Sequence, residues 1–111
     1  MSSEQAEDVE AKAFTELEDK YSEEWRNQAY NLVLDATGKY IERNNLRSSD
    51  FPNTASSAFY ILALAVAKKK LAFKPDEGEK YLMGQLKRIR DGGYDVLIQI
   101  FQEIMNPHLL Q

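Results

Sequence analysis

Apolar residues recur every three to four positions along most of this chain, which places them on one face of an α-helix. In the first segment the stripe is carried, at intervals of four, by Val9, Ala13, Leu17, Tyr21 and Trp25. The pattern predicts a helix from about residue 5 onward. The serine at position 22 is suited to cap a new helix, but the stripe continues past it, so one long helix and two shorter ones both fit.

A second predicted helix runs from Ser22 to Arg43 and contains no proline. Asn44-Asn45 closes it, because asparagine tolerates the left-handed backbone that ends many helices. The polar stretch from Leu46 to Asp50, followed by Pro52, predicts a loop. Asn53 or Thr54 then offers an N-cap for the next helix.

The third predicted helix, Ala55 to about Phe73, contains the ten-residue apolar run from Ala58 to Ala67. A helix that is apolar nearly all round must be covered by its neighbours, so this one forms the core. The run is about half of the ~20 residues that a membrane-spanning helix needs, and we therefore expect no membrane association.

Two further helices are predicted after Pro75. The fourth runs from Glu77 to Asp91, where Asp76 followed by Glu79 has the spacing of a capping box. Gly92-Gly93 ends it, and the fifth runs from Tyr94 to Asn106. The expected fold is all-α: a compact bundle of about five helices around an apolar central helix. It forms one domain over residues 1–111, with an acidic helix or arm (1–25), a core bundle (26–106) and a tail (107–111).

Charge is distributed unevenly along the chain. Residues 1–25 contain nine acidic and two basic side chains, whereas residues 26–111 contain nine acidic and twelve basic ones. Such asymmetry suits an acidic arm attached to a surface that meets polyanions. It equally suits acids that keep the protein soluble and complement helix N-termini. The chain has no cysteine and its first residues lack the features of a secretory signal, so we expect a cytoplasmic protein.

No residue pattern for catalysis or metal binding is present. The single histidine, His108, follows a proline near the end of the chain and has no cysteine or second histidine to share a metal with. Phosphate-binding glycine loops, zinc-protease, nucleophile-elbow and calcium-loop patterns are all missing. We therefore expect a protein that is not an enzyme and that has no catalytic residue, cofactor or metal.

The fourth predicted helix carries a basic face. On a helical wheel its cations gather on the side opposite to the apolar stripe of Leu82, Leu86 and Ile89. Gly84 lies among these cations, where it costs about 1 kcal/mol of helix propensity relative to alanine and suggests close access to the backbone. The candidate phosphate-binding residues of this face are Lys80, Lys87, Arg88 and Arg90.

A second basic patch ends the third predicted helix and consists of Lys68, Lys69, Lys70 and Lys74. Cations there also interact favourably with the negative end of the helix dipole, which explains them without any ligand. Two tyrosines, Tyr81 and Tyr94, flank the fourth helix. Aromatic rings near cations suit the stacking of nucleic-acid bases, although tyrosines at the edge of a core are common too.

Three stretches of this all-helical layout are distinctive: Phe51-Pro52, then Ala55-Ser56-Ser57-Ala58-Phe59 leading into Leu62-Ala63-Leu64-Ala65-Val66-Ala67-Lys68, and later Leu86-Lys87-Arg88-Ile89. They give the chain a resemblance to the small subunits of multi-subunit CRISPR effector complexes. It covers about residues 26–105, and the acidic residues 1–25 have no counterpart in it. The resemblance implies copies stacked along a guide-RNA filament, where basic side chains help to hold target or displaced strands without catalysis.

Two functions fit the sequence. The first is a non-catalytic, nucleic-acid-associated subunit of a ribonucleoprotein or DNA-binding assembly, which contacts phosphates of guide RNA or of a target or displaced strand through its basic helix. Its other partners would be protein subunits, including copies of itself. The alternative is a protein-binding regulator or inhibitor, of phage or immunity type, that docks through its acidic N-terminal helix.

Overall fold

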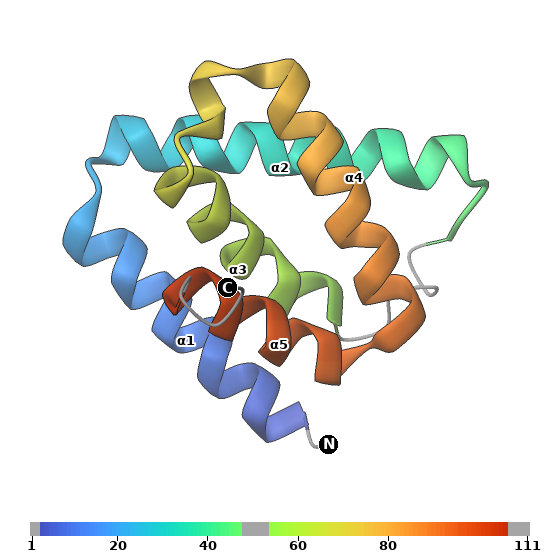
Figure 1. Cartoon of the computed structure of the whole chain (residues 1–111), viewed down its shortest axis with the longest axis horizontal. Coiled ribbons are helices and arrows are strands. Elements are labelled where there is room, and N and C mark those ends of the chain that lie inside the picture. Colours follow the sequence, from blue (N-terminus) through green and yellow to red (C-terminus); the bar gives the residue numbers. More distant parts are fainter. Residues whose placement is uncertain (1–2, 48–53, 107–111) are drawn as a thin grey trace.

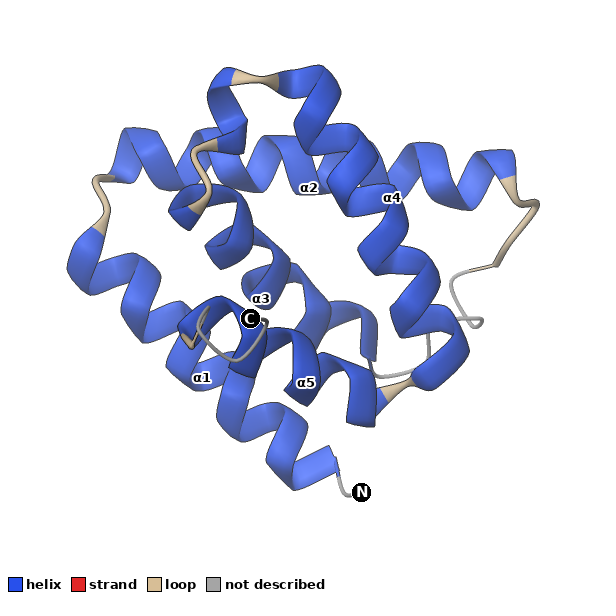
Figure 2. Cartoon of the chain, viewed as in Figure 1, coloured by secondary structure: helices blue, strands red, loops and turns tan. Residues whose placement is uncertain are grey.

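The computed structural model describes residues 3–47 and 54–106. These residues form five α-helices and one short 3-10 helix, drawn in blue in Figure 2, and they contain no strand. The all-α prediction is confirmed. The candidate N-cap Asn53, the loop proline Pro52 and the tail with His108 lie outside the described residues. The elements are α1 (Ser3–Lys20), α2 (Glu23–Arg43), α3 (Thr54–Lys68), η2 (Leu71–Phe73), α4 (Pro75–Gly92) and α5 (Tyr94–Met105).

The first two helices are separate. Ser22 adopts an extended backbone and its Oγ accepts a hydrogen bond from the backbone N–H of Trp25 at 3.2 Å, which caps α2. The guanidinium of Arg26 donates to the carbonyl of Tyr21 across the same junction. The serine cap therefore decides between the two possibilities that the apolar stripe leaves open.

The end of α2 follows the prediction from Asn44-Asn45. Asn44 is the C-cap, and its Nδ2 donates to the carbonyl of Tyr40 at 2.9 Å. Asn45 has the left-handed backbone, with φ of 52°. The backbone N–H of Asn45 donates to the carbonyl of Glu42 at 3.3 Å, so the asparagine pair satisfies carbonyls of the last turn.

The central helix is α3. Every residue from Ile61 to Ala67 is at most 2% exposed, as expected for a helix that is apolar on all sides. Figure 1 shows α3 in the middle of the molecule, and α1, α2, α4 and α5 all contact it. Its alanines let these neighbours approach closely, while its larger side chains fill the spaces between them.

The prediction that this helix continues to Phe73 is wrong. The α-helix ends at Lys68 because Lys70 turns into a left-handed backbone, with φ of 57° and ψ of 32°. The chain then forms η2, which packs Leu71 partly into the core. Helix propensity gives no sign of this stop, because lysine is a good helix former.

The predicted capping box at Asp76 is also wrong. Helix α4 begins at Pro75, whose fixed φ and missing N–H suit the first helical position, and its N-cap is Lys74. Asp76 consequently lies in the first turn, and Glu79 turns toward α2. Gly93, with φ of 64°, ends α4 as predicted, and α5 starts at the next residue.

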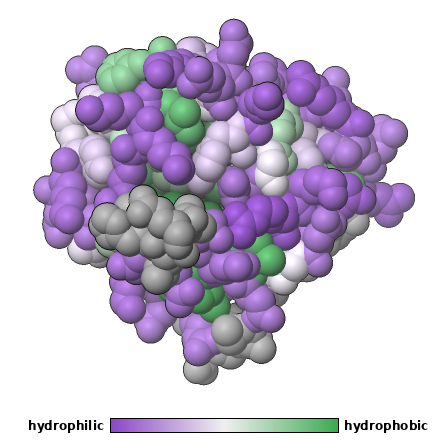
Figure 3. All heavy atoms as spheres, viewed as in Figure 1, coloured by the Kyte–Doolittle hydropathy of each residue, from purple (hydrophilic) through white to green (hydrophobic). Residues whose placement is uncertain are grey.

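The acidic N-terminal segment is a packed helix. Val9, Ala13 and Leu17 of α1 are buried, and α1 lies against α3 and α5 (Figure 1). The face of the molecule in Figure 3 is mainly hydrophilic, with small separate hydrophobic areas. Among the side chains that the structure describes, three large apolar ones are exposed: Phe14, Leu34 and Phe73. None of the helices in the described residues is both long and apolar enough to cross a membrane.

Candidate nucleic-acid interface

Three of the four cations predicted on α4 lie on its exposed face: Lys80, Lys87 and Arg90. Lys80 and Arg90 make no ion pair with any described residue. Lys87 pairs with Asp91 at 3.3 Å, one turn later on the helix. Carboxylates therefore share this face with the cations, so its positive charge is weaker than the lysines and arginines alone suggest.

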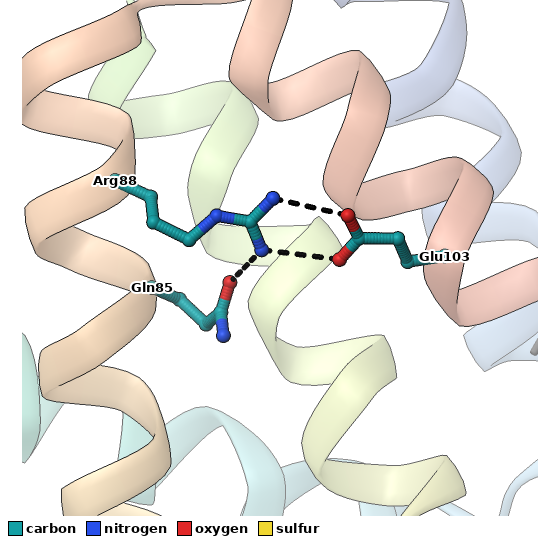
Figure 4. A network of polar contacts seen from close by, with 3 residues as sticks. All are labelled: Gln85, Arg88 and Glu103. Carbon is teal, nitrogen blue, oxygen red and sulfur yellow. Dashed lines mark hydrogen bonds and ion pairs between the residues drawn. The ribbon is translucent and has the colours of Figure 1, made fainter. Parts of the chain in front are cut away.

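Arg88 is not part of this exposed set. Its guanidinium forms a two-pronged ion pair with Glu103 of α5, with both N–O distances 3.0 Å (Figure 4). The Nη1 also donates to Gln85 Oε1 at 2.8 Å. The side chains of Arg88 and Glu103 are 36% and 23% exposed. Hydrogen bonding to Glu103 raises the pKa of Arg88, so the guanidinium stays charged and ties α4 to α5.

A groove between the end of α2 and the second half of α4 contains two of the exposed α4 cations, Lys87 and Arg90. It has a volume of about 590 Å³. Arg43 of α2 faces Lys87 and Arg90 of α4 across it, with Asp91 as its one carboxylate. We call it the α2–α4 groove; its lining residues are Tyr40, Arg43, Asn44, Met83, Gly84, Lys87, Arg90 and Asp91.

The sequence reasoning missed the α2 half of this groove. Arg43 is the last residue of α2, and its sequence position gives no sign that it lies near Lys87. Ion pairs join α2 to α4 at this point. Glu79 lies 3.2 Å from Lys39 and 3.7 Å from Arg43, and the interactions of Lys39 with Asp35 and Glu79 raise the pKa of that lysine.

Gly84 leaves bare backbone at the edge of the groove. A Cβ added there would meet no atom within 4 Å, so nothing inside the chain requires a glycine. Gly78, in the same helix, is different: a Cβ would lie 2.6 Å from Leu32 Cδ2 and 3.2 Å from the carbonyl oxygen of Leu71. Gly78 is therefore explained by packing, whereas Gly84 is accessible from outside.

The second basic patch does not form one surface. The Nζ of Lys69 lies 5.5 Å from the centre of the Tyr81 ring, on the α4 side. Lys74 pairs loosely with Glu77 at 4.0 Å. Lys68 and Lys70 instead line a pocket next to the start of α2, together with Lys20, the last residue of α1. The four lysines therefore lie in three different environments.

Tyr81 is the most perturbed titratable group in the described part of the chain. Burial raises the pKa of its hydroxyl to about 12, and the nearby carboxylate of Glu103 adds to the effect. A phenol that holds its proton this firmly cannot act as a base near neutral pH. Tyr94, the other predicted flanking tyrosine, is half-buried and packs against the core.

The charged groups that line the α2–α4 groove are mainly cations. Across residues 3–47 and 54–106, no three histidine, cysteine, aspartate or glutamate side chains are placed to hold a metal ion. Guanidinium and ammonium groups around an open groove are suited to the oxygens of a phosphate backbone. In comparisons with protein-family models, curated proteins and solved structures, none matches the chain.

Proposed function

We propose that this protein is a non-catalytic subunit that binds the phosphate backbone of a nucleic acid through the α2–α4 groove. The assembly would be a ribonucleoprotein or a DNA-binding complex, of the kind implied by the resemblance to CRISPR small subunits. The observation that supports it is the meeting of Arg43, Lys87 and Arg90 around the bare backbone at Gly84. Lys80, four residues before this glycine on the exposed side of α4, extends the basic surface.

The site favours backbone contact over base readout. Arginine forms paired hydrogen bonds to phosphate, and an exposed backbone lets a strand approach closely. The groove is open and its polar groups are mainly cationic, which suits binding without sequence preference. The strand would be guide RNA or a target or displaced strand. Neighbouring subunits, including copies of this chain, would complete the assembly.

The test is salt-dependent binding of a fluorescent single-stranded oligonucleotide. Each phosphate contact releases counterions, so the log–log slope of affinity against salt should be about −0.7 per contact, or between about −2 and −3 for three or four contacts. Arg90→Glu should weaken binding about tenfold at low salt, because it replaces an unpaired cation by an anion, and should flatten the slope by about 0.7.

Lys12→Glu is the matched control. Lys12 is exposed on α1, forms no ion pair with any described residue and lies outside the groove, so this variant changes the net charge equally. It should bind like the parent. Equal weakening by both variants would mean that overall charge, not the groove, governs binding. Arg88 is unsuitable for reversal, because a carboxylate at that position would face Glu103.

A protein-only partner remains the second candidate, and the surface of α1 favours it. Glu7, Asp8 and Asp19 are exposed and make no ion pair with any described residue, and Phe14 lies exposed on the same helix. Glu16 and Glu18 are less useful for testing this role, since they already pair with Lys20 and Arg26. Copurification from the native host, with and without nuclease, separates the two functions.

The neutral variant Glu7→Gln/Asp8→Asn decides the outcome. If the acid-neutralised variant no longer copurifies with the partner while Arg90→Glu still does, the protein is a regulator and the nucleic-acid proposal is wrong. If nuclease treatment or Arg90→Glu removes the partner and the acid-neutralised variant retains it, the nucleic-acid proposal stands.

A further inference from the structure

A second, smaller pocket lies where α1, α2 and the end of α3 meet, away from the α2–α4 groove. Its volume is about 300 Å³, at the lower end of the range for small-molecule sites. We call it the junction pocket; it is lined by Lys20, Tyr21, Ser22, Trp25, Ala67, Lys68 and Lys70.

Three ammonium groups surround the junction pocket. Lys68 and Lys70 are exposed and form no ion pair with a described residue. Lys20 also lines the pocket, but its ammonium group already pairs with Glu16 at 3.2 Å. Glu23 and Glu24 are exposed in the first turn of α2 but do not line the pocket. The lining is therefore net positive and suited to an anion.

Aromatic rings form the other side of the pocket. Tyr21 and Trp25 stack with their ring centres 6.2 Å apart and their planes at 27°. Phe73 of η2 lies outside the pocket lining and supports Trp25 from beside it, edge-on, with the ring centres 4.9 Å apart. Planar heterocycles stack on such rings, and rings beside lysines are the combination that binds single nucleotides of a strand.

Lys70 has an unusual backbone conformation for a lysine. Its left-handed conformation occurs at a position that follows a helix end, where glycine is most common. A lysine is kept there at a conformational cost. The location of its side chain at the pocket gives a reason for that choice.

We propose that the junction pocket binds one nucleotide, with its phosphate held by Lys68 and Lys70 and its base against the rings of Tyr21 and Trp25. This site does not depend on the α2–α4 groove. A free nucleotide and the end of a nucleic-acid strand offer the same base and phosphate, and the junction pocket binds that shared unit.

Fluorescence titration tests the proposal directly, since Trp25 is the only tryptophan in the chain. Adenosine 5′-monophosphate should quench Trp25 saturably at concentrations below about 1 mM. Adenosine alone and inorganic phosphate alone should each bind at least about tenfold more weakly, because each lacks half of the contacts. Absence of saturable quenching by the nucleotide and by a 5′-phosphorylated oligonucleotide would overturn the proposal, as would equally tight binding of phosphate alone.

The source of the nucleotide is resolved by competition. Tighter binding of a 5′-phosphorylated oligonucleotide than of its unphosphorylated form and of the mononucleotide indicates a strand end. Equal or tighter binding of the mononucleotide indicates a free nucleotide. Both results support the pocket.

Variants separate binding from folding. Lys68→Ala and Lys70→Ala should each raise the dissociation constant of the mononucleotide about tenfold, since each removes one charge-assisted contact, whereas Lys12→Ala should not change it. Lys70→Gly should raise the melting temperature, because glycine accepts the left-handed backbone, and should still weaken binding. Binding by Lys70→Gly as tight as by the parent would overturn the role of Lys70.

The groove variant Arg90→Glu should bind the mononucleotide like the parent. If Arg90→Glu binds oligonucleotide more weakly but binds the mononucleotide unchanged, the groove and the pocket are separate sites and each proposal can be tested without the other.

Discussion

Arg88 shows how far a helical wheel can locate a functional side chain. The wheel correctly places it away from Leu82 and Leu86, but it contains no information about the neighbouring helix. In the structure α5 brings Glu103 within 3.0 Å of both terminal nitrogens of Arg88. A cation at the border of an apolar stripe is therefore a candidate for an interhelical ion pair, while those at the centre of the exposed face, such as Lys80, remain available to a ligand.

The same cluster makes Tyr81 a measurable probe. One of the six tyrosines should ionise only near pH 12, because burial disfavours its charged form. Following tyrosinate absorbance against pH should reveal this late step, and Tyr81→Phe should remove it. A parent protein in which all tyrosines ionise together near the ordinary value, while still folded, would contradict the burial of Tyr81.

Stability should follow the same titration. The folded-state pKa of Tyr81 lies above its unfolded value of 10.0, so the stabilising contribution is complete below pH 10 and is lost as pH rises toward 12. In that interval the unfolded chain binds fewer protons than the folded one. Chemical denaturation at several pH values should show this decline, and the decline should be shallower in Tyr81→Phe.

At the scale of elements, helix ends were predictable where a residue has a strong local preference. Asn45 and Gly93 take left-handed backbones, and Ser22 caps α2. The ends that sequence missed depend on other interactions. Lys70 breaks α3 although lysine favours helices, because packing of Leu71 returns the chain to the core. Pro75 starts α4 before Asp76 can cap it.

Helix α1 should contribute to stability as a part of the core. Leu17 is fully buried, so Leu17→Ala should lower the free energy of unfolding by roughly 2–5 kcal/mol, an amount typical of a core cavity. Chemical denaturation measures it. Leu34→Ala is the control, because Leu34 is exposed on α2 and its truncation should cost about 0.5 kcal/mol or less. Near-equal effects of the two substitutions would mean that α1 is an appended arm.

At the scale of the whole molecule, the two proposed binding sites are formed by segments that are distant in sequence. The α2–α4 groove joins Arg43 to Lys87, and the junction pocket joins Tyr21 to Lys68. Periodicity predicts which face of each helix is apolar, which was sufficient for the fold class and for the exposure of Lys87. It does not predict which helices are neighbours or how far one slides along another. The sequence therefore could not predict which residue each cation contacts.

A single core predicts a single unfolding transition. Buried residues of all five helices belong to one hydrophobic cluster. Thermal unfolding followed by far-ultraviolet circular dichroism, which reports on all helices, should coincide with unfolding followed by Trp25 fluorescence, which reports on the α1–α2 junction. Separate midpoints would show that the N-terminal helices melt independently.

The position of α1 also has a consequence for synthesis on the ribosome. Its apolar side packs mainly against α3 and also against α5, and barely touches α2, so α1 is fully covered only after α5 has emerged. At about 5–20 residues per second, this wait is on the order of ten seconds. During that time Val9, Ala13 and Leu17 are exposed to other nascent chains. The dense negative charge around them would then act as a temporary shield that keeps the unfinished chain from aggregating.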